Sequence, residues 1–274
     1  MIFRKKQYII GTSIDHKEIR VVLLDKQTKN IKTQYTINTP QKNIDHFFNI
    51  FKALISPIID SIKKQKNELI GMGISLYNND KINIPFFKKK ELIAIIENNL
   101  KLTTKHSDWD KSNFEAEIEI GAFKKYKFKK IYNLIINNKI KSLTFDKNKI
   151  QNNQNLENLI INFIDLQSLK EILKNNYKDD ILNLLDSFYR KENENESQLK
   201  EATSLIISII NNSYYFTRPE AILLSSNFNN QSDIFFSNIK KKSEKLINNN
   251  IKIFSSKLGK DAIAIGAALN FLKD

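Results

Sequence analysis

The sequence contains none of the short motifs that usually mark an enzyme active site. Its 274 residues include no Gly-rich phosphate-binding loop, no Ser–His–Asp arrangement and no HExxH metal motif. It has no cysteine, so thiolate chemistry and disulfides are both excluded. The three histidines, His16, His46 and His106, are too scattered to predict a metal site. These residue types therefore do not suggest a class of enzyme by themselves.

The pattern of apolar residues predicts how the first part of the chain is built. Residues 7–14, 18–25 and 30–38 are rich in Ile, Val, Thr and Tyr and are joined by short polar turns, which favours strands. Thr39 followed by Pro40 predicts a helix start. The elements expected next are a helical stripe through 45–62, a strand at 69–76 and a helix at 91–100.

A second region begins near Ser112 and again mixes strands with helices. Its expected elements are a hairpin (131–136 and 141–145), an Asn-rich surface loop (148–155), helical stripes (156–166 and 199–209) separated by a polar turn (190–197), and two short strands (219–224 and 251–254) separated by a helix (232–246).

Only six glycines occur in the chain, and their placement is the most informative feature of the sequence. Residues 256–262, Ser-Lys-Leu-Gly-Lys-Asp-Ala, lead into residues 265–269, Ile-Gly-Ala-Ala-Leu. This run resembles the last strand, turn and final helix of the ROK family of sugar kinases and sugar-responsive repressors. The other glycines also fall where that family places one, at Gly11, Gly71, Gly73 and Gly121.

The resemblance implies an α/β fold of the two-lobed actin-like (ribonuclease H-like) ATPase type, with mixed sheets flanked by helices. The predicted order of three strands, helix, strand, helix and strand is that of the first lobe in such proteins. We expect this N-terminal lobe to cover residues 1–111 and to be completed by a C-terminal helix within residues 260–274. Residues 112–259 then form the second lobe.

The first hairpin differs from the family where phosphate would bind. In working members it reads roughly GIDIGGTKIRVVLLD, whereas residues 11–25 here read GTSIDHKEIRVVLLD. The resemblance places Ser13 at the aspartate that helps to hold the metal–nucleotide, Asp15 and His16 at the two glycines, and Lys17 at the threonine. An acidic residue and added side chains oppose a polyphosphate there. Lys17 either contacts an anion or is a solvated turn residue.

Two further ligand motifs of the family are also altered. Ser225 and Ser226 stand where the family has a pair of glycines beside the adenosine. Asp80 is either a remnant of the sugar-contacting turn, which the family writes PGxxD, or a polar loop residue. Because both nucleotide-facing turns are changed, we expect no ATP or magnesium site unless the chain is a diverged kinase.

The catalytic loop of the family reads NDANAAALGE, and its aspartate accepts the proton of the sugar hydroxyl. Alignment on Glu117 and Gly121 places Asp108 at the asparagine and Trp109 at the catalytic aspartate. Asp108 or Asp110 remains a candidate base if the loop is shifted by one residue. The alternative is that both carboxylates simply favour the start of a helix at this point.

The family's zinc module requires a histidine and clustered cysteines in the second lobe. The chain has no cysteine, so we expect no structural zinc of that type and no other metal site. Lack of cysteine and of a signal-peptide pattern favours a cytoplasmic location. The apolar runs are far shorter than the ~20 residues of a membrane helix, so no membrane partner is expected.

The net charge of +14 raises the question of nucleic-acid binding. Arginine occurs only at Arg4, Arg20, Arg190 and Arg218, so 40 of the 44 basic residues are lysine. Base readout favours the arginine fork, whereas lysines give non-specific, salt-sensitive attraction. The lysines reflect either AT-rich coding or a dedicated surface, for which residues 124–130 and 240–245 are the first candidates.

Three functions follow from these observations. The first is a catalytically inactive ROK-like protein, a regulatory or sugar-sensing pseudokinase that binds a sugar or sugar phosphate and can form a homodimer. The second is a transcriptional regulator or nucleic-acid binder that uses a lysine-rich surface. The third is a diverged ATP-dependent hexose kinase, in which case ATP and magnesium would bind. We favour the first, and thus a protein that is not an enzyme.

Overall fold

The computed structural model describes residues 5–77, 89–136, 140–152, 196–225, 233–247 and 251–273. Their contacts group the chain into two compact units, Met1–Ile120 with Asp261–Asp274 and Gly121–Lys260. The boundaries expected from the sequence, after residues 111 and 259, stay a prediction. Asp80, Ser226 and the helical stripe at 156–166 lie outside the described residues.

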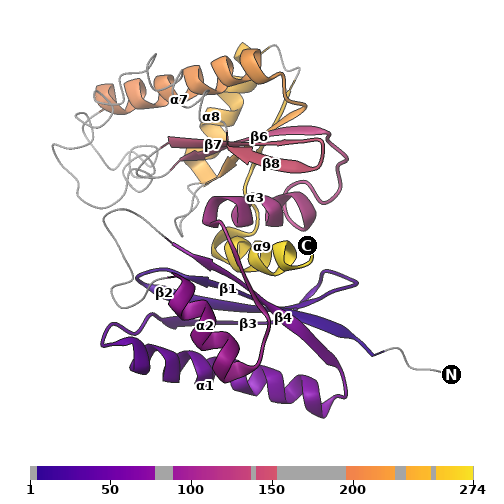
Figure 1. Cartoon of the computed structure of the whole chain (residues 1–274). Coiled ribbons are helices and arrows are strands. Elements are labelled where there is room, and N and C mark those ends of the chain that lie inside the picture. The colour runs from indigo at the N-terminus through magenta and orange to yellow at the C-terminus, as the bar shows by residue number, and fades with distance from the viewer. Residues whose placement is uncertain are drawn as a thin grey trace. The chain divides into compact units, whose positions relative to one another are not determined.

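The first unit begins with the element order that the sequence predicts (Figure 1). Its elements are β1 (Gln7–Ile14), β2 (Glu18–Asp25), β3 (Ile31–Asn38), α1 (Ile44–Lys64), β4 (Glu68–Leu76), α2 (Lys89–Leu100), β5 (Thr104–Ser107), α3 (Trp109–Glu119) and α9 (Ala262–Phe271). The strands form one mixed sheet in the order β3-β2-β1-β4-β5. The β1–β2 and β2–β3 pairs are antiparallel, and β1–β4 and β4–β5 are parallel.

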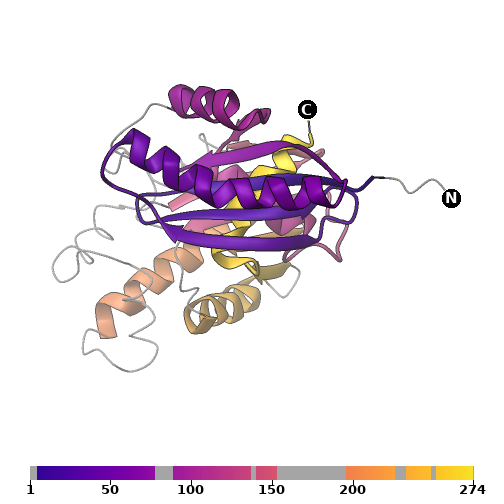
Figure 2. The ribbon, with the colours of Figure 1, turned by 90° about the horizontal axis from the view of Figure 1, so that it is seen from below.

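One face of this sheet is covered by α1 and α2, as Figure 2 shows for α1 lying across the strands. Apolar residues at helical spacing in α1 are fully buried, among them Phe47, Phe51 and Ile55. They meet alternate residues of β1, including Ile10 and Ile14, because successive strand side chains point to opposite faces. The predicted helix and strand faces thus form one core.

The start of α1 differs from the sequence prediction. Thr39 and Pro40 were expected to begin the helix, but α1 begins at Ile44 and its N-cap is Asn43. The Asn43 side chain accepts a hydrogen bond of 2.8 Å from the His46 N–H. The prediction at Thr39 was wrong because Thr39 has a tertiary hydrogen-bond partner at the β1–β2 turn, as described below.

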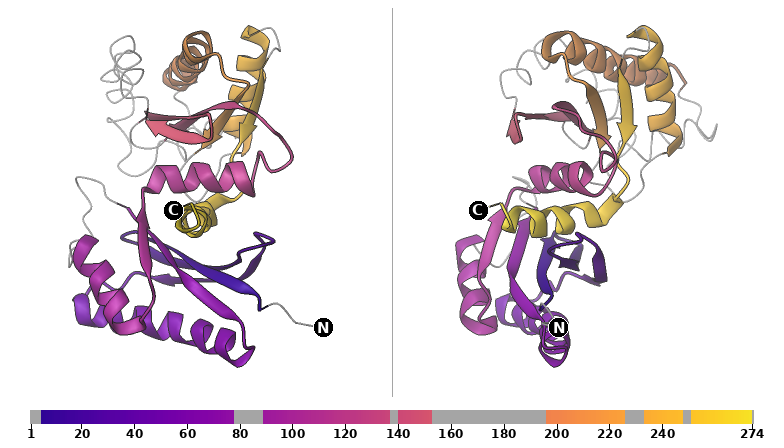
Figure 3. Two further views of the ribbon diagram at one scale, coloured as in Figure 1. Left: turned by 45° about the vertical axis from the view of Figure 1, so that its right-hand side comes forward. Right: turned by 90° about the vertical axis from the view of Figure 1, so that its right-hand side faces the viewer.

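The other face of the sheet is covered by α9 at very close range (Figure 3). A Cβ atom built on Gly11 would lie 2.0 Å from the Ala264 carbonyl oxygen, and one on Gly73 would lie 1.9 Å from that of Ala267. On the far side of α9, a Cβ on Gly266 would lie 1.7 Å from the Ser112 carbonyl oxygen in α3. These distances explain why three of the six glycines cannot carry a side chain.

The second unit has the same sheet topology as the first. Its elements are β6 (Lys130–Ile136), β7 (Ile140–Asp146), β8 (Lys149–Asn152), α7 (Glu196–Thr217), β9 (Ala221–Ser225), α8 (Asp233–Leu246) and β10 (Lys252–Ser255). The strand order is β10-β9-β6-β7-β8, with β6–β7 and β7–β8 antiparallel and β6–β9 and β9–β10 parallel. Two mixed sheets flanked by helices confirm the predicted fold class.

One element of the second unit was missed. The Asn-rich residues 148–155 were expected to form a loop, but Lys149–Asn152 is the edge strand β8. Its pairing with β7 runs from Asp146 opposite Lys149 to Leu143 opposite Asn152. Lys147 and Asn148 turn the chain with φ of 50° and 62°, a conformation that Asn tolerates well. Tight pairing to an existing sheet therefore outweighs the weak strand propensity of this segment.

Candidate functional site

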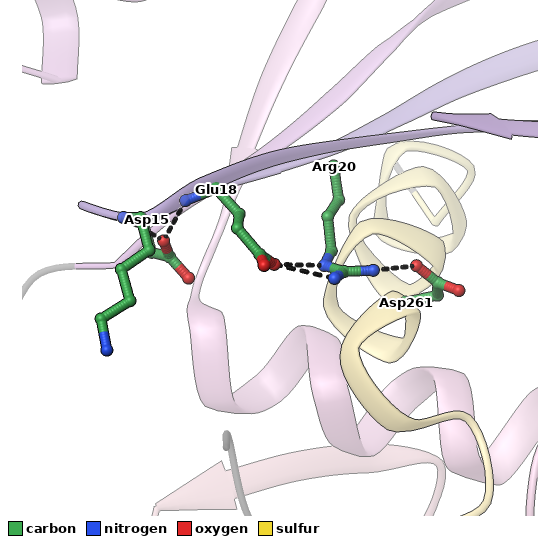
Figure 4. Close-up of polar contacts among 5 residues, drawn as sticks. Asp15, Glu18, Arg20 and Asp261 are labelled. Atoms are coloured by element: carbon green, nitrogen blue, oxygen red, sulfur yellow. Dashed lines mark hydrogen bonds and ion pairs between the residues drawn. The ribbon is translucent and has the colours of Figure 1, made fainter. Parts of the chain in front are cut away.

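The β1–β2 turn is the position where the resemblance predicts a phosphate-binding turn. It spans Asp15–Glu18, and the Asp15 N–H donates to the Glu18 carbonyl at 3.0 Å. The Asp15 carboxylate accepts hydrogen bonds from the backbone N–H groups of Lys17 and Glu18, each at 2.6 Å (Figure 4). The carboxylate thereby takes two donors that a phosphate group would need in order to bind at this turn.

The carbonyl groups of the same turn are held by the segment that follows β3. The Thr39 hydroxyl donates to the Asp15 carbonyl at 2.7 Å, and the Thr39 N–H donates to the Lys17 carbonyl at 2.9 Å. The Gln41 side chain donates to the His16 carbonyl at 2.7 Å. The turn is thus fixed from two sides, and any opening to admit a ligand breaks several hydrogen bonds.

The same aspartate-to-backbone hydrogen bonding occurs in the turn at the opposite end of β2, where the family resemblance implies no ligand. Asp25 accepts hydrogen bonds from the N–H groups of Gln27 at 3.0 Å and Thr28 at 2.9 Å. The spacing of two and three residues matches that of Asp15 with Lys17 and Glu18. An aspartate that closes its own turn is a common structural motif. Asp15 therefore has the geometry of a residue that closes its own turn.

Burial and hydrogen bonding act in opposite directions on Asp25. Burial raises the pKa of the Asp25 carboxyl, while hydrogen bonds from Thr28 and Gln27 and the charge of Lys32 lower it. The hydrogen bonds and the lysine charge together outweigh the effect of burial, so the pKa of Asp25 lies below its ordinary value of 3.8.

Arg20 connects the hairpin to the start of α9, as Figure 4 shows. Its guanidinium donates to the Glu18 carboxylate from Nε at 3.1 Å and from Nη2 at 2.7 Å, and to the Asp261 carboxylate from Nη1 at 2.9 Å. The Arg20 side chain is 16% exposed, so solvent screens these pairs only in part. Sequence reasoning missed this group. Glu18 and Arg20 share one face of β2, which is a usable signal, whereas Asp261 lies 241 residues further on.

The predicted catalytic carboxylates lie at the start of α3. Asp108 is the N-cap of this helix, and its side chain accepts the Lys111 N–H at 2.9 Å. Asp110 follows in the first turn and is buried. Between them, the Trp109 ring lies edge-on to the Tyr77 ring with a centroid distance of 5.1 Å. An indole thus occupies the position at which the alignment would place the proton acceptor.

The predicted adenosine turn is represented by Ser225, the last residue of β9. Its hydroxyl donates to the Asn133 side-chain oxygen on β6 at 2.7 Å, and both residues are fully buried. This hydroxyl therefore forms a hydrogen bond inside the second unit, between strands β9 and β6. The structure brings Asp15, His16 and Lys17 together at the β1–β2 turn, with Ser13 buried near the end of β1. It places Asp108 and Asp110 together at the start of α3.

Neither a metal cluster nor a membrane span is found in the part of the chain that the structure describes. No group of three His, Asp or Glu side chains there is arranged to hold a metal ion. No helix among the same residues is long and apolar enough to cross a membrane.

Comparisons with solved structures identify the fold. The ROK hexokinase from Thermus thermophilus superposes with a TM-score of 0.67 at 12% identity, over 96% of this chain and 97% of that one. A ROK-family transcriptional regulator, a homologue of the E. coli MLC protein, gives 0.65 at 12% identity, over 96% of this chain and 77% of that one.

This chain has the ROK fold. A third ROK structure, from Streptococcus pneumoniae in complex with sucrose, gives a TM-score of 0.62 at 14% identity and covers 97% of this chain and 98% of that one. No protein-family model matches the sequence, and no curated protein matches it. The ROK resemblance predicted from the glycines is therefore confirmed by structure, at an identity that sequence comparison does not detect.

Proposed function

We propose that this ROK-like protein is a regulatory or sugar-sensing pseudokinase that does not use ATP. The observation that carries the proposal is the hydrogen bonding of Asp15 to the N–H groups of Lys17 and Glu18. A nucleotide phosphate would have to displace a carboxylate that is already satisfied and would meet its negative charge. The residues at this turn therefore do not fit a bound magnesium–nucleotide.

The start of α3 supports the same proposal. Phosphoryl transfer to a sugar needs a carboxylate within hydrogen-bond reach of the reacting hydroxyl. The carboxylate of Asp108 caps the helix, and Trp109 packs against Tyr77 at the aligned position. Asp110 is the remaining candidate base if the loop is shifted. On this proposal its role is electrostatic, because a negative charge near the N-terminus of α3 is favourable.

The adenosine side gives a third, independent argument. Glycines let a base and ribose approach the backbone, whereas Ser225 carries a side chain and is bonded to Asn133. The change at Ser225 lies in the second unit, and the change at Asp15 lies in the first. Two separate structural features thus support the proposed loss of nucleotide binding.

The proposed ligand is a sugar or a sugar phosphate. The ROK fold occurs in a hexokinase, in a transcriptional regulator and in a protein with bound sucrose. Ligand sensing needs only a difference in affinity between two conformations, and it needs no proton acceptor. A cytoplasmic homodimer, whose partner surface responds to the ligand, is the form in which we expect it to act.

Thermal unfolding with separate ligands tests the proposal. The protein is heated with millimolar magnesium-ATP, and separately with glucose, mannose, fructose or an N-acetylated hexosamine. A ligand raises the midpoint only if it binds the folded state. We expect no shift with magnesium-ATP, a saturable shift with at least one sugar, and no phosphate transfer to any sugar.

The possible failures are distinguishable. No shift with any sugar would remove the sensing role and leave the loss of ATP binding standing. A saturable shift with magnesium-ATP together with phosphate transfer would favour the diverged kinase. In that case the Asp110→Asn variant must abolish transfer, and Asp108→Asn serves as the matched control.

A further inference from the structure

The loop between α3 and β6 carries an unusual concentration of exposed lysines. Residues 121–130 contain no acidic residue, and Lys124, Lys125, Lys127 and Lys129 are exposed. Lys252, at the start of β10, is also exposed. The Glu220 carboxylate lies beside the loop and accepts a hydrogen bond from the Lys129 N–H at 2.6 Å. The loop therefore presents a dense positive charge from one short segment.

Aromatic rings alternate with these lysines and pack together. Tyr126 and Phe128 are stacked, with ring centroids 5.2 Å apart and an angle of 10° between the ring planes. Phe254 meets both rings edge-on, at 5.1 Å from Tyr126 and 6.0 Å from Phe128. Phe123 completes the cluster at 4.8 Å from Phe254. The outermost ring is that of Tyr126, which is 43% exposed.

The loop holds this ring in place before any ligand arrives. Phe123 is 2% exposed, and its carbonyl accepts the Tyr126 N–H at 2.7 Å. The Lys252 ammonium lies over the Tyr126 ring, 5.4 Å from its centroid, so a cation that can contact a phosphate is held next to the ring. Fixing an aromatic side chain in advance lowers the entropy lost on binding.

We propose that this surface, the aromatic–lysine platform (Phe123, Tyr126, Phe128, Phe254 and the lysines 124, 125, 127, 129 and 252), binds single-stranded nucleic acid. The lysines contact phosphates, and a base stacks on the exposed part of Tyr126, a combination typical of sites for single strands. A duplex hides its base faces, and an acidic peptide uses the lysines without the ring. The proposal goes beyond sugar sensing and does not depend on it.

Binding of a fluorescent oligothymidylate of about twelve nucleotides, followed by anisotropy, tests the ring. Tyr126→Ala leaves the charge unchanged, and we expect it to weaken binding about tenfold. Tyr126→Phe keeps the stacking surface and is expected to bind like the wild type. Tyr215→Ala is the matched control, because Tyr215 is 55% exposed and lies on α7, outside the platform.

The charge is tested with two matched triple variants. Lys124→Glu/Lys125→Glu/Lys127→Glu changes exposed residues of the platform, and Lys241→Glu/Lys242→Glu/Lys245→Glu changes exposed residues of α8 by the same net charge. We expect the first to weaken binding far more and to flatten its dependence on salt, since fewer counterions are released. Melting temperatures are measured for every variant.

Several results would overturn the proposal. Equal loss in the two triple variants would mean diffuse attraction by lysines. Unchanged binding by a folded Tyr126→Ala would exclude base stacking. If Tyr126→Ala does not fold, the triple variants alone decide the matter. Equal affinity for a duplex of the same length or for polyglutamate would show that the surface recognises negative charge in general.

Discussion

Two regions only a few residues apart, one in β1 and one in the turn that follows it, compare differently with the ROK sequence pattern: the first keeps its glycine and the second does not. At Gly11, the family's glycine is present, and α9 packs so close that a side chain has no room. At Asp15 and His16, where the resemblance expects two glycines, side chains are present and one of them closes the turn. The glycine of the first region is required for packing whether or not a ligand binds. The resemblance assigns the glycines of the second region to phosphate binding. The difference supports our proposal that the fold is kept while nucleotide binding is lost.

The sheet of the second unit extends this comparison. It has the same strand order as the first sheet but no glycine in its strands. Helix α7 instead meets this sheet through a buried polar pair, in which the Ser213 hydroxyl donates to the Tyr132 hydroxyl of β6 at 3.0 Å. Glycine is therefore not a demand of this topology. It is needed where a helix touches the sheet backbone directly.

The largest effect is expected from Gly266→Ala, which breaks the packing region. The added methyl group would collide with backbone of α3, which cannot rotate away as a side chain can. We expect the free energy of unfolding to fall by about 3 kcal/mol or more. Urea denaturation measures it. Gly259→Ala is the control: its φ is 57° but no atom lies within 4 Å, so about 1 kcal/mol is expected. Equal effects would contradict the close packing.

Arg20→Met tests the link between the end of the β1–β2 turn at Glu18 and the start of α9 at Asp261. It removes the guanidinium from both the Glu18 and Asp261 carboxylates, which are 24% and 25% exposed. Because the group is partly buried, we expect a loss of about 2 kcal/mol, with a smaller loss for Arg20→Lys. A double-mutant cycle with Asp261→Asn isolates the pair. A coupling energy near zero would mean that Arg20 does not tie β2 to α9.

Asp15→Ala tests the turn region itself. Two backbone N–H groups lose their acceptor, and we expect the free energy of unfolding to fall by about 1 kcal/mol, since water can replace it in part. The same variant should gain a small, saturable rise in melting temperature with phosphate, because an anion can take the place of the carboxylate. Asp25→Ala is the matched control and should show no such gain. A gain in both variants, or in neither, would contradict the assigned role of Asp15.

The smallest effect concerns pH and Asp25. Its folded pKa is below the ordinary value of 3.8, so the ionised form contributes stability above the unfolded pKa, and this is lost as pH falls through the folded pKa. Asp25→Asn keeps an acceptor oxygen but cannot ionise. The stability difference between wild type and variant should therefore shrink between about pH 5 and pH 3, as measured by urea denaturation. A difference that grows on acidification would reverse the assigned sign.

The sequence predicted those parts of the fold that depend on local pattern. Strand and helix order, the buried stripe of α1 and the small-residue packing of α9 all follow from periodicity and from the glycines. Features set by distant partners were not predictable. In the sequence Thr39 resembles a helix cap, but in the structure its hydroxyl donates to the Asp15 carbonyl. Arg20 resembles a surface residue, but it pairs with Asp261, which is 241 residues away in the sequence. The turn-closing role of Asp15 depends on backbone geometry that its neighbours in sequence do not fix.

Calorimetric titration of magnesium-ATP into the unmodified protein tests the central claim most directly. If the Asp15 carboxylate occupies the phosphate donors and the side chain of Ser225 replaces the adenosine glycine, no saturable heat should appear up to millimolar nucleotide. A saturable isotherm at micromolar nucleotide, abolished when magnesium is removed, would contradict the claim and establish that the ROK fold of this chain still binds its nucleotide.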